Sequence, residues 1–576
     1  MKFKELASYL EKLEKTASRN QITEILAELF KKASAQEIDL IIYLLLGGLA
    51  PKYESIVFNL ADRMMIRVVA NAYDKDPKEV TSSYKKTGDL GIVAEKFAND
   101  KGQDFSITQV FENLRLIAID EGEGSQDRKV VDTAKLLSCL DSLSVRYVTR
   151  IPVGKLRLGF SDRTIIDALS WMIAGDKSES LRIKEAYNVI PDVGALAKKI
   201  KKEGLEKALT DKTPMIGIPV APMLAQRLKS TDEMIKKMGV VSVEPKFDGL
   251  RLLIHFRRKD YPKKGDVEII KAFTRNMNSV DISVFPELFE IGQHINANEV
   301  ILDTEAVGMD QKREQIVDFQ KTIQRRRKHD IGEASKKTPL QFQVFDILLK
   351  DKKSFLNTPY QKRRSELESV VKDGTLLRVD EYEITDDPKR IKDLHEKYLG
   401  KGLEGVIVKK ADSLYVSGRT GWRWVKMKEV EGTHAKLADT VDGVVMGYTR
   451  GKGRRATFGV GQFLVGVRHK DKIQTATKVG TGITDLQFKK LNKKLEKIRA
   501  IRKPGEYDVP KILEPDFWVE PKLVVELAAD EITKSPTHTS GYALRFPRLI
   551  KFREDKSFKE ATTKSELVDI FNLQKN

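Results

Sequence analysis

The stretch Val243–Arg251, VEPKFDGLR, decides how the middle of this chain is interpreted. It lies inside the run VVSVEPKFDGLRLLIHF, whose β-branched and aromatic residues predict two β-strands on either side of a tight turn. Lys246 stands in that turn, among neighbours that favour burial. Either its side chain points to solvent as an ordinary turn lysine, or it is an amine whose pKa is lowered by loss of water and which acts as a nucleophile.

Length and composition indicate a protein of several domains. The chain has 576 residues, and about 150 residues per domain predicts three or four domains. Its 40% hydrophobic and 32% charged residues are ordinary for a globular protein. The longest apolar run, IIYLLLGGLAP from Ile41, is too short to span a bilayer, and the N-terminal helical pattern contains no signal-peptide core. We therefore expect a cytoplasmic protein without a membrane partner.

The cysteine content and the net charge limit the classes of protein to which this chain can belong. The chain has one cysteine, Cys139, which excludes a disulfide scaffold and a Cys-rich zinc module. Its place in a helical apolar pattern predicts a core position. The net charge of +19 favours a polyanionic partner such as nucleic acid, because lysine and arginine release condensed counterions when they dock on phosphates. A lysine-rich proteome would give the same excess, so the charge alone does not decide.

Three regions follow from the hydrophobic patterns. Residues 1–212 have apolar residues at helical spacing from Phe3 onward and predict an all-helical region. After a proline-rich join, residues 217–430 alternate short β-branched strands with helical segments, as in a mixed α/β domain. Residues 431–576 are β-rich with glycine-rich turns, which is consistent with a small barrel.

Within the helical region, the segment RYVTRIPVGKLRLGFSD at 146–162 predicts an interruption of the helical pattern. Its glycines would let the backbone approach a phosphate closely, and Ser161 or Asp162 could cap the following helix. The alternative is a loop between helices with solvated arginines.

A set of ordered motifs extends the signal at Lys246. Lys-x-Asp-Gly alone is weak, but it is followed by FTRNMNSVD, ILDTEAVG, FQVFDIL, LEGVIVKK, WRWVKMK and LRFPRLIKFREDK. In this order the motifs resemble those of the covalent nucleotidyltransferases, which include ATP-dependent DNA ligases, RNA ligases and mRNA capping enzymes. With the helical N-terminal third, essentially the whole chain resembles the replicative type of ATP-dependent DNA ligase found in archaea and eukaryotes.

This resemblance implies a fold and an activity. The fold would be a helical DNA-binding domain at 1–212, a nucleotidyltransferase adenylation domain at 217–430 and an OB-fold β-barrel at 431–576. The activity would be sealing of 5′-phosphate/3′-hydroxyl nicks in duplex DNA, through a lysyl-AMP intermediate, in replication, repair and recombination. The β-rich domain would rotate between adenylation and sealing.

The resemblance also implies ligands and partners. ATP would be the substrate that forms lysyl-AMP, and Mg²⁺ the metal, with Mn²⁺ as the alternative. Nicked double-stranded DNA would be the partner of a nucleoid-associated monomer. Replicative relatives also bind a sliding clamp, although the sequence contains no clear clamp-binding peptide.

The resemblance assigns roles to residues around the first motif. Lys246 would attack the α-phosphate of ATP, and Glu244 would read the adenine edge. Arg251 and Arg275 would contact the nucleotide or the nick phosphate, because a guanidinium fork suits phosphate oxygens. Glu305 would face the ribose hydroxyls or a metal.

Later motifs would complete the site. Phe345 would stack on adenine, and Glu404 would help to bind Mg²⁺. Lys426 and Lys428 alternate on one strand, so they share a face and would neutralise charge on the α-phosphate.

One motif position departs from the family pattern, and the last motif has a separate role. The family's basic residue before the tryptophan of WRWVKMK would fall on Thr420, so Arg419 is the nearest candidate for that nucleotide contact. The last motif would orient the pyrophosphate leaving group and contact DNA. Its candidate residues are Arg553, Asp555 and Lys556.

Other function classes fit the sequence less well. A capping enzyme or RNA ligase would not need about 200 helical residues before its lysine motif, and an NAD-dependent ligase would need its Cys-rich zinc module. A non-catalytic DNA-binding scaffold would not need the intact set of lysines and glutamates. The choice among ATP, ADP and GTP stays open, because an aromatic stack tolerates any purine.

Overall fold

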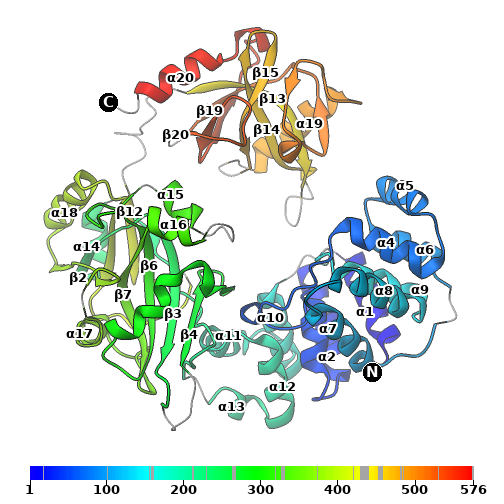
Figure 1. Cartoon of the computed structure of the whole chain (residues 1–576), viewed down its shortest axis with the longest axis horizontal. Coiled ribbons are helices and arrows are strands. Elements are labelled where there is room, and N and C mark those ends of the chain that lie inside the picture. The colour runs from blue at the N-terminus through cyan, green and yellow to red at the C-terminus, as the bar shows by residue number, and fades with distance from the viewer. Residues whose placement is uncertain are drawn as a thin grey trace. The chain divides into compact units, whose positions relative to one another are not determined.

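The computed structural model divides the chain into two units, Met1–Met427 and Lys428–Asn576. It describes residues 1–573 except 17, 100–101, 155, 157, 159–160, 211–212, 229, 262–267, 318, 326–330, 373, 419–420, 429–439, 452–457, 481–482, 484 and 530. The helices and strands of both units are labelled in Figure 1.

The first unit begins with the predicted all-helical region, drawn from blue to cyan-green in Figure 1. The apolar stripe of its first helix is buried in one core, with Phe3, Leu6, Leu10 and Leu13 all at most 1% exposed. No helix among the described residues is long and apolar enough to cross a membrane. The helices are α1 (Phe3–Lys15), α2 (Arg19–Lys32), α3 (Ile38–Leu45), α4 (Asp62–Tyr73), α5 (Pro77–Thr87), α6 (Leu90–Phe97), α7 (Ile107–Ile119), α8 (Ser125–Ser138), α9 (Ser142–Arg150), α10 (Asp162–Ala174), α11 (Ser180–Val189), α12 (Val193–Glu203) and α13 (Leu205–Ala208).

The arginine- and glycine-rich segment at 146–162 differs from both expectations at its N-terminal end. Its first five residues continue α9, and Arg150 is buried rather than solvated or open to a phosphate. The Arg150 guanidinium lies 2.7 Å from Asp89 Oδ2 and 2.9 Å from Glu14 Oε2, so it is a structural ion pair. Ser161 is the N-cap of α10 but its side chain makes no capping hydrogen bond.

Cys139 does not occupy the predicted core position. It is the residue that follows α8, and its side chain is only half-buried.

After the proline-rich join, strands and helices alternate in the order predicted from the β-branched runs. The strands are β1 (Gln226–Arg227), β2 (Val241–Pro245), β3 (Leu250–Arg257), β4 (Ile269–Thr274), β5 (Ser279–Val280), β6 (Glu299–Gly308), β7 (Leu340–Lys350), β8 (Lys353–Ser354), β9 (Leu377–Val379), β10 (Glu383–Thr385), β11 (Gly405–Lys410) and β12 (Trp424–Lys428). The helices are α14 (Thr231–Met238), α15 (Phe319–Gln324), α16 (Ile331–Lys337), α17 (Tyr360–Val370) and α18 (Pro388–Gly400).

These strands form two sheets, and the predicted turn at Lys246 connects them. One sheet has the order β1-β12-β11-β2-β10, and the other has the order β5-β4-β3-β6-β7-β8 with β9 beside β7. The strands on either side of Lys246 are present as predicted, but β2 and β3 belong to different sheets and do not pair with each other. Every residue of β2 is buried, and Val241 and Val243 pack in one cluster with residues of α14 and α18 (Figure 1).

A shared apolar core lies beside the larger sheet. Leu253, Phe273 and Leu348 of that sheet pack in one cluster with Met223 and with Trp424 of β12. The cluster therefore joins residues of both sheets.

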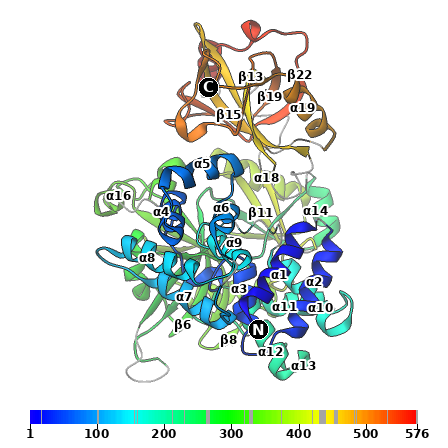
Figure 2. The same ribbon diagram turned by 90° about the vertical axis from the view of Figure 1, so that its right-hand side faces the viewer.

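The second unit is β-rich, as predicted. Its main sheet has the order β16-β18-β13-β14-β15-β17, and β19 pairs with both β13 and β22. Bulges in the β13/β14, β14/β15 and β19/β22 pairings bend the sheet, and Figure 2 shows that it curls. Residues of α19 and α20 pack in its core (both helices are labelled in Figure 1). The elements are β13 (Val441–Arg450), β14 (Val460–His469), β15 (Lys472–Val479), α19 (Asp485–Lys497), β16 (Arg499–Ala500), β17 (Tyr507–Asp508), β18 (Phe517–Val519), β19 (Val524–Ala528), β20 (Glu531–Lys534), β21 (Tyr542–Arg545), β22 (Arg548–Phe552) and α20 (Lys564–Leu573).

A buried histidine makes the stability of the larger sheet pH-dependent. His255 of β3 is 0% exposed and its Nδ1 accepts the Gly217 N–H at 3.1 Å. Burial, with a smaller contribution from Lys271, lowers the pKa of His255 to about 3. Because the folded pKa lies below the unfolded value, the neutral imidazole stabilises the fold above pH 6.5, and this stabilisation is lost as the pH falls toward 3.

We expect His255→Gln, which keeps an acceptor but cannot titrate, to remove this dependence. Relative to the variant, the wild type should lose on the order of 2–3 kcal/mol of unfolding free energy between pH 7 and about pH 4.5. Thermal unfolding of both proteins across this range measures the difference. Parallel curves would contradict the burial argument.

Candidate active site

Lys246 and Glu404 face each other where the chain crosses between the two sheets. The backbone N–H of Lys246 donates to Gly405 O at 2.9 Å, and that of Glu404 donates to Lys246 O at 3.0 Å. These bonds place Glu404 and Gly405 beside Lys246, and the side chains of Lys246 and Glu404 form an ion pair. The Lys246 side chain is 19% exposed, so it is accessible from solvent rather than fully desolvated.

Two glycines permit the close backbone approaches around this pair. A Cβ on Gly249 would lie 2.4 Å from Ala306 O and 3.0 Å from Glu305 Cγ, so the turn can rest against β6 only without a side chain. Gly405 has a φ of +123°, and a Cβ there would lie 2.3 Å from Met427 O. The glycine of the Lys-x-Asp-Gly motif is therefore required by packing.

Arg251 is held by a carboxylate that the sequence did not single out. Its Nε and Nη2 lie 2.9 and 2.6 Å from the two oxygens of Asp303, and its Nη1 donates to Met223 O at 2.7 Å. Burial opposes the charge, but Asp303 outweighs it and raises the pKa of Arg251. The guanidinium carbon lies 5.4 Å from the ring centroid of Phe345 and 5.7 Å from that of Trp424. Asp303 thus orients the guanidinium beside the predicted stacking residue.

Glu305 is electrostatically coupled to the lysine. It pairs with Arg251 in the register of β3 and β6. Burial raises the pKa of Glu305 to about 7, opposed by Lys246 and Arg251 and reinforced by Asp303 and Asp248. The carboxyl of Glu305 therefore exchanges its proton near neutral pH, next to the candidate nucleophile, as is common at functional sites.

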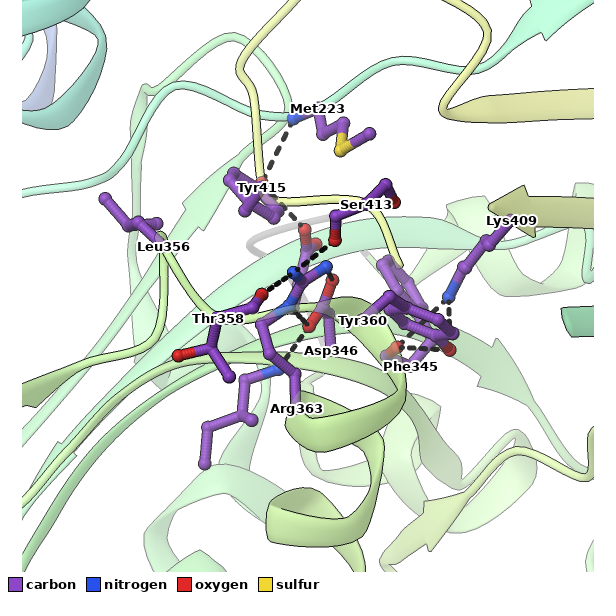
Figure 3. Close-up of polar contacts among 12 residues, drawn as sticks. Met223, Phe345, Asp346, Leu356, Thr358, Tyr360, Arg363, Lys409, Ser413 and Tyr415 are labelled. Carbon is purple, nitrogen blue, oxygen red and sulfur yellow. Dashed lines mark hydrogen bonds and ion pairs between the residues drawn. The ribbon is translucent and has the colours of Figure 1, made fainter. Parts of the chain in front are cut away.

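The predicted adenine-binding residues, Glu244 and Phe345, meet at one buried lysine. Glu244 is 1% exposed, and Lys409 Nζ lies 2.5 Å from its Oε2. Phe345 is half-buried and its ring packs edge-on against Trp424 at 6.0 Å. Figure 3 shows Lys409 directed toward Phe345 and Tyr360. Sequence reasoning missed Lys409 and Tyr360, although Lys409 stands inside the quoted motif LEGVIVKK.

The other predicted site residues of the first unit that the structure describes lie just after β4 and on β12. Arg275 is exposed just after β4. Lys426 and Lys428 lie two residues apart on β12, as predicted. The Lys428 side chain lies outside the described residues, as does Arg419, so the structure gives no contact for either.

The predicted residues of the second unit form an ion-pair cluster of their own. Arg553 Nη1 lies 3.0 Å from Asp442 Oδ2, and Lys556 Nζ lies 2.7 Å from the same oxygen. Arg553 Nη2 lies 2.6 Å from Asp555 Oδ2, and this contact holds the pKa of Asp555 below its usual range. Asp442, which sequence reasoning did not select, is the shared anchor of both cations.

The carboxylates of Glu404 and Glu305 are better suited to a cation that binds together with a nucleotide than to a metal held by the protein alone. Among the described residues, no three His, Cys, Asp or Glu side chains are arranged to hold an ion. Magnesium in nucleotide enzymes is usually bound by one or two carboxylates, and phosphates and water supply the other ligands. Glu404 and Glu305 can supply carboxylates of this kind beside Lys246.

Comparison with known proteins covers the whole chain. Residues 2–170 match the family described as DNA ligase N terminus, residues 222–428 the ATP dependent DNA ligase domain, and residues 456–556 the ATP dependent DNA ligase C terminal region. A probable DNA ligase of Dictyoglomus thermophilum is 40% identical over 586 residues, covering 100% of this chain and 98% of the relative. A DNA ligase of Sulfurisphaera tokodaii is 34% identical over 603 residues, with the same coverage of 100% and 98%.

A solved structure also resembles the fold. The structure named Pmar-Lig_PreS3 aligns with a TM-score of 0.55 at 18% identity, covering 95% of this chain and 99% of that one. The alignment extends over both units, so the order of a helical region, a mixed α/β region and a curled β-rich region is shared.

Proposed function

Because the chain belongs to the ATP-dependent DNA ligase family, whose general activity is nick sealing, we propose that it seals 5′-phosphate/3′-hydroxyl nicks in duplex DNA through a lysyl-AMP intermediate. The observation that carries this proposal is the ion pair of Lys246 with Glu404 at the crossing between two sheets, where the backbone of Lys246 bonds to Glu404 and Gly405.

The first step is attack by Lys246 Nζ on the α-phosphorus of ATP. The ammonium must first lose a proton, and the Glu404 carboxylate that pairs with it is the adjacent acceptor. A nitrogen–phosphorus bond then forms while the bond from phosphorus to the pyrophosphate oxygen breaks. Lys426 and Lys428, two residues apart on β12, are placed by sequence to offset charge on the phosphorane.

The second and third steps transfer AMP and close the nick. An oxygen of the DNA 5′-phosphate attacks the lysyl-AMP phosphorus, and Lys246 leaves as an amine that takes up a proton. The 3′-hydroxyl oxygen then attacks the 5′-phosphorus, and AMP leaves with the former bridging oxygen. Arg251, oriented by Asp303, would contact the nucleotide or the nick phosphate.

Glu404 and Glu305 would hold Mg²⁺, which when bound would neutralise phosphate charge during these transfers. Neither residue depends on the ion for its position, since the Glu404 backbone is fixed by Lys246 and Glu305 lies within β6.

The wider biology is proposed from the family and the charge. The net charge of +19 suits a duplex DNA partner. We place the enzyme in DNA replication, repair and recombination, acting as a monomer in the cytoplasm at the nucleoid, with a sliding clamp as a further partner.

Nick sealing on a labelled nicked duplex tests the proposed function. The assay supplies ATP, ADP, GTP or NAD⁺ in parallel reactions with Mg²⁺ or Mn²⁺. We expect sealing with ATP and none with NAD⁺. An enzyme that seals only with NAD⁺, or with no nucleotide, would contradict the proposal.

Arg553 gives a step-specific prediction, because its proposed role is to orient the pyrophosphate leaving group. Arg553→Ala should slow self-adenylation by about 100-fold and change the sealing of a pre-adenylated nick by only a few-fold. The matched control is Arg499→Ala, an exposed arginine of the same unit whose guanidinium lies over Phe517. Equal slowing of both steps would argue against a role confined to adenylation.

A further inference from the structure

Lys409 connects the two residues that we place around the nucleotide base. The side chain is buried on β11, and its Nζ lies 2.5 Å from Glu244 Oε2. It donates to the backbone carbonyl of Phe345 at 3.1 Å and to the Tyr360 hydroxyl at 3.2 Å (Figure 3). The contacts to Phe345 and Tyr360 are hydrogen bonds, whereas the contact to Glu244 is an ion pair.

Tyr360 completes the connection from the opposite side. Its side chain is 1% exposed, and its hydroxyl donates to Glu244 Oε1 while it accepts from Lys409. Burial, reinforced by the Glu244 carboxylate, raises the pKa of Tyr360 well above its ordinary value. The hydroxyl therefore stays protonated at neutral pH and remains a donor to Glu244.

The hydrogen bonds and ion pair of the Glu244 carboxylate limit how many further hydrogen bonds it can accept. Its Oε1 accepts from Tyr360 and from Ser242 Oγ at 3.0 Å, and its Oε2 faces Lys409. Oε2 is buried and accepts no hydrogen bond in the structure, although a carboxylate oxygen can accept about two, so acceptor capacity remains on Oε2. An amino group of a base can donate to that oxygen, whereas a carbonyl oxygen would meet a second acceptor.

These contacts suggest how the site selects the nucleotide base. Resting on the proposed function, in which ATP binds beside Lys246, we propose that Lys409 and Tyr360 are positioning residues that set base specificity through Glu244. They hold Glu244 as an acceptor for the amino group of a 6-aminopurine and tie it to the stacking residue Phe345. A 6-oxopurine nucleotide is then rejected, because its carbonyl cannot donate. Neither positioning residue touches the nucleotide itself.

The test measures self-adenylation with ATP, inosine triphosphate and purine riboside triphosphate, which has no amino group. For the wild type we expect kcat/KM to fall by at least about 10-fold when the amino group is removed, and further with inosine triphosphate. In Tyr360→Phe, kcat/KM for ATP should fall about 10-fold, through KM, while that for purine riboside triphosphate changes little.

Matched controls separate positioning from general destabilisation. Tyr147→Phe removes a tyrosine–glutamate hydrogen bond of the same kind, the 2.8 Å bond from the buried Tyr147 to Glu14 in the helical region. Lys129→Met removes a buried lysine that donates to two backbone carbonyls, and it is the control for Lys409→Met. The controls should keep the wild-type ratio of ATP to inosine triphosphate, and the variants at 360 and 409 should not.

The outcomes distinguish this inference from the proposed function. If Lys409→Met does not fold, Lys409→Arg keeps the charge and should retain more discrimination than Tyr360→Phe. Folded variants at 360 and 409 that keep the wild-type base ratio would overturn the inference while the proposed function stands. A wild type that forms no adenylate with any nucleotide would overturn both.

Discussion

Replacing Lys246 with alanine is expected to reduce covalent AMP labelling by at least about 10⁴-fold, because the substitution removes the proposed nucleophile itself. Labelled ATP, Mg²⁺ and a denaturing gel measure this loss. The protein should remain folded, since the Lys246 side chain is partly exposed and its backbone bonds to Glu404 and Gly405 do not need the ammonium. Sealing of a pre-adenylated nick should continue, because that step does not require formation of lysyl-AMP.

Two further variants separate nucleophilic from electrostatic roles. Lys246→Arg keeps the positive charge beside Glu404, but a guanidinium does not lose its proton and cannot attack phosphorus. We therefore expect it to be as inactive in labelling as the alanine variant. Lys410→Ala is the neighbouring control, a partly exposed lysine 3.6 Å from Asp412, and it should label normally. Substantial labelling of Lys246→Arg would mean that another group forms the covalent bond.

Arg363→Met is expected to cost about 3–5 kcal/mol of unfolding free energy. Arg363 and Asp346 are both 0% exposed, with Nε and Nη2 of the arginine 2.8 and 2.9 Å from the two carboxylate oxygens (Figure 3). Nη1 donates to Thr358 O at 2.7 Å and to Ser413 O at 3.1 Å. Removing the guanidinium leaves a buried carboxylate and two carbonyls without these donors, beside the predicted stacking residue Phe345.

An exposed pair of the same geometry provides the control for this stability experiment. Arg390 lies 2.6 and 2.8 Å from the two oxygens of Glu383, but these side chains are 46% and 39% exposed. Arg390→Met should therefore change stability by less than about 1 kcal/mol. Denaturant unfolding of the three proteins measures both values. A loss below about 1 kcal/mol for Arg363→Met would show that burial does not amplify this interaction.

The sequence predicted the strands but not their division into sheets. The runs LQFQVFDILL and EVILDTEAVG are rich in apolar, aromatic and β-branched residues, which predicts strands. Both are strands in the structure. Nothing in VVSVEPKFDGLRLLIHF indicates that β2 pairs with β10 and β11 while β3 pairs with β4 and β6. Strand pairing depends on residues far away in the chain, and local propensity carries no information about those partners.

The same limit explains which site residues were missed. Lys246, Glu244 and Phe345 stand in motifs with a recognisable family pattern. Tyr360 begins a helix 116 residues after Glu244, and a tyrosine at the start of a helix does not by itself predict a hydrogen bond to a distant carboxylate. Asp303 was quoted within its motif, but a bidentate contact to Arg251 becomes visible only once β3 and β6 are paired.

The central claim is that Lys246 forms a covalent bond to AMP, and mass analysis of the protein after incubation with ATP and Mg²⁺ tests it most directly. The intact mass should increase by one AMP group, and peptide mapping should place the group on the peptide that contains Lys246. The adduct should disappear on addition of pyrophosphate, which reverses the step. No adduct, or an adduct mapped to a peptide without Lys246, would contradict the account.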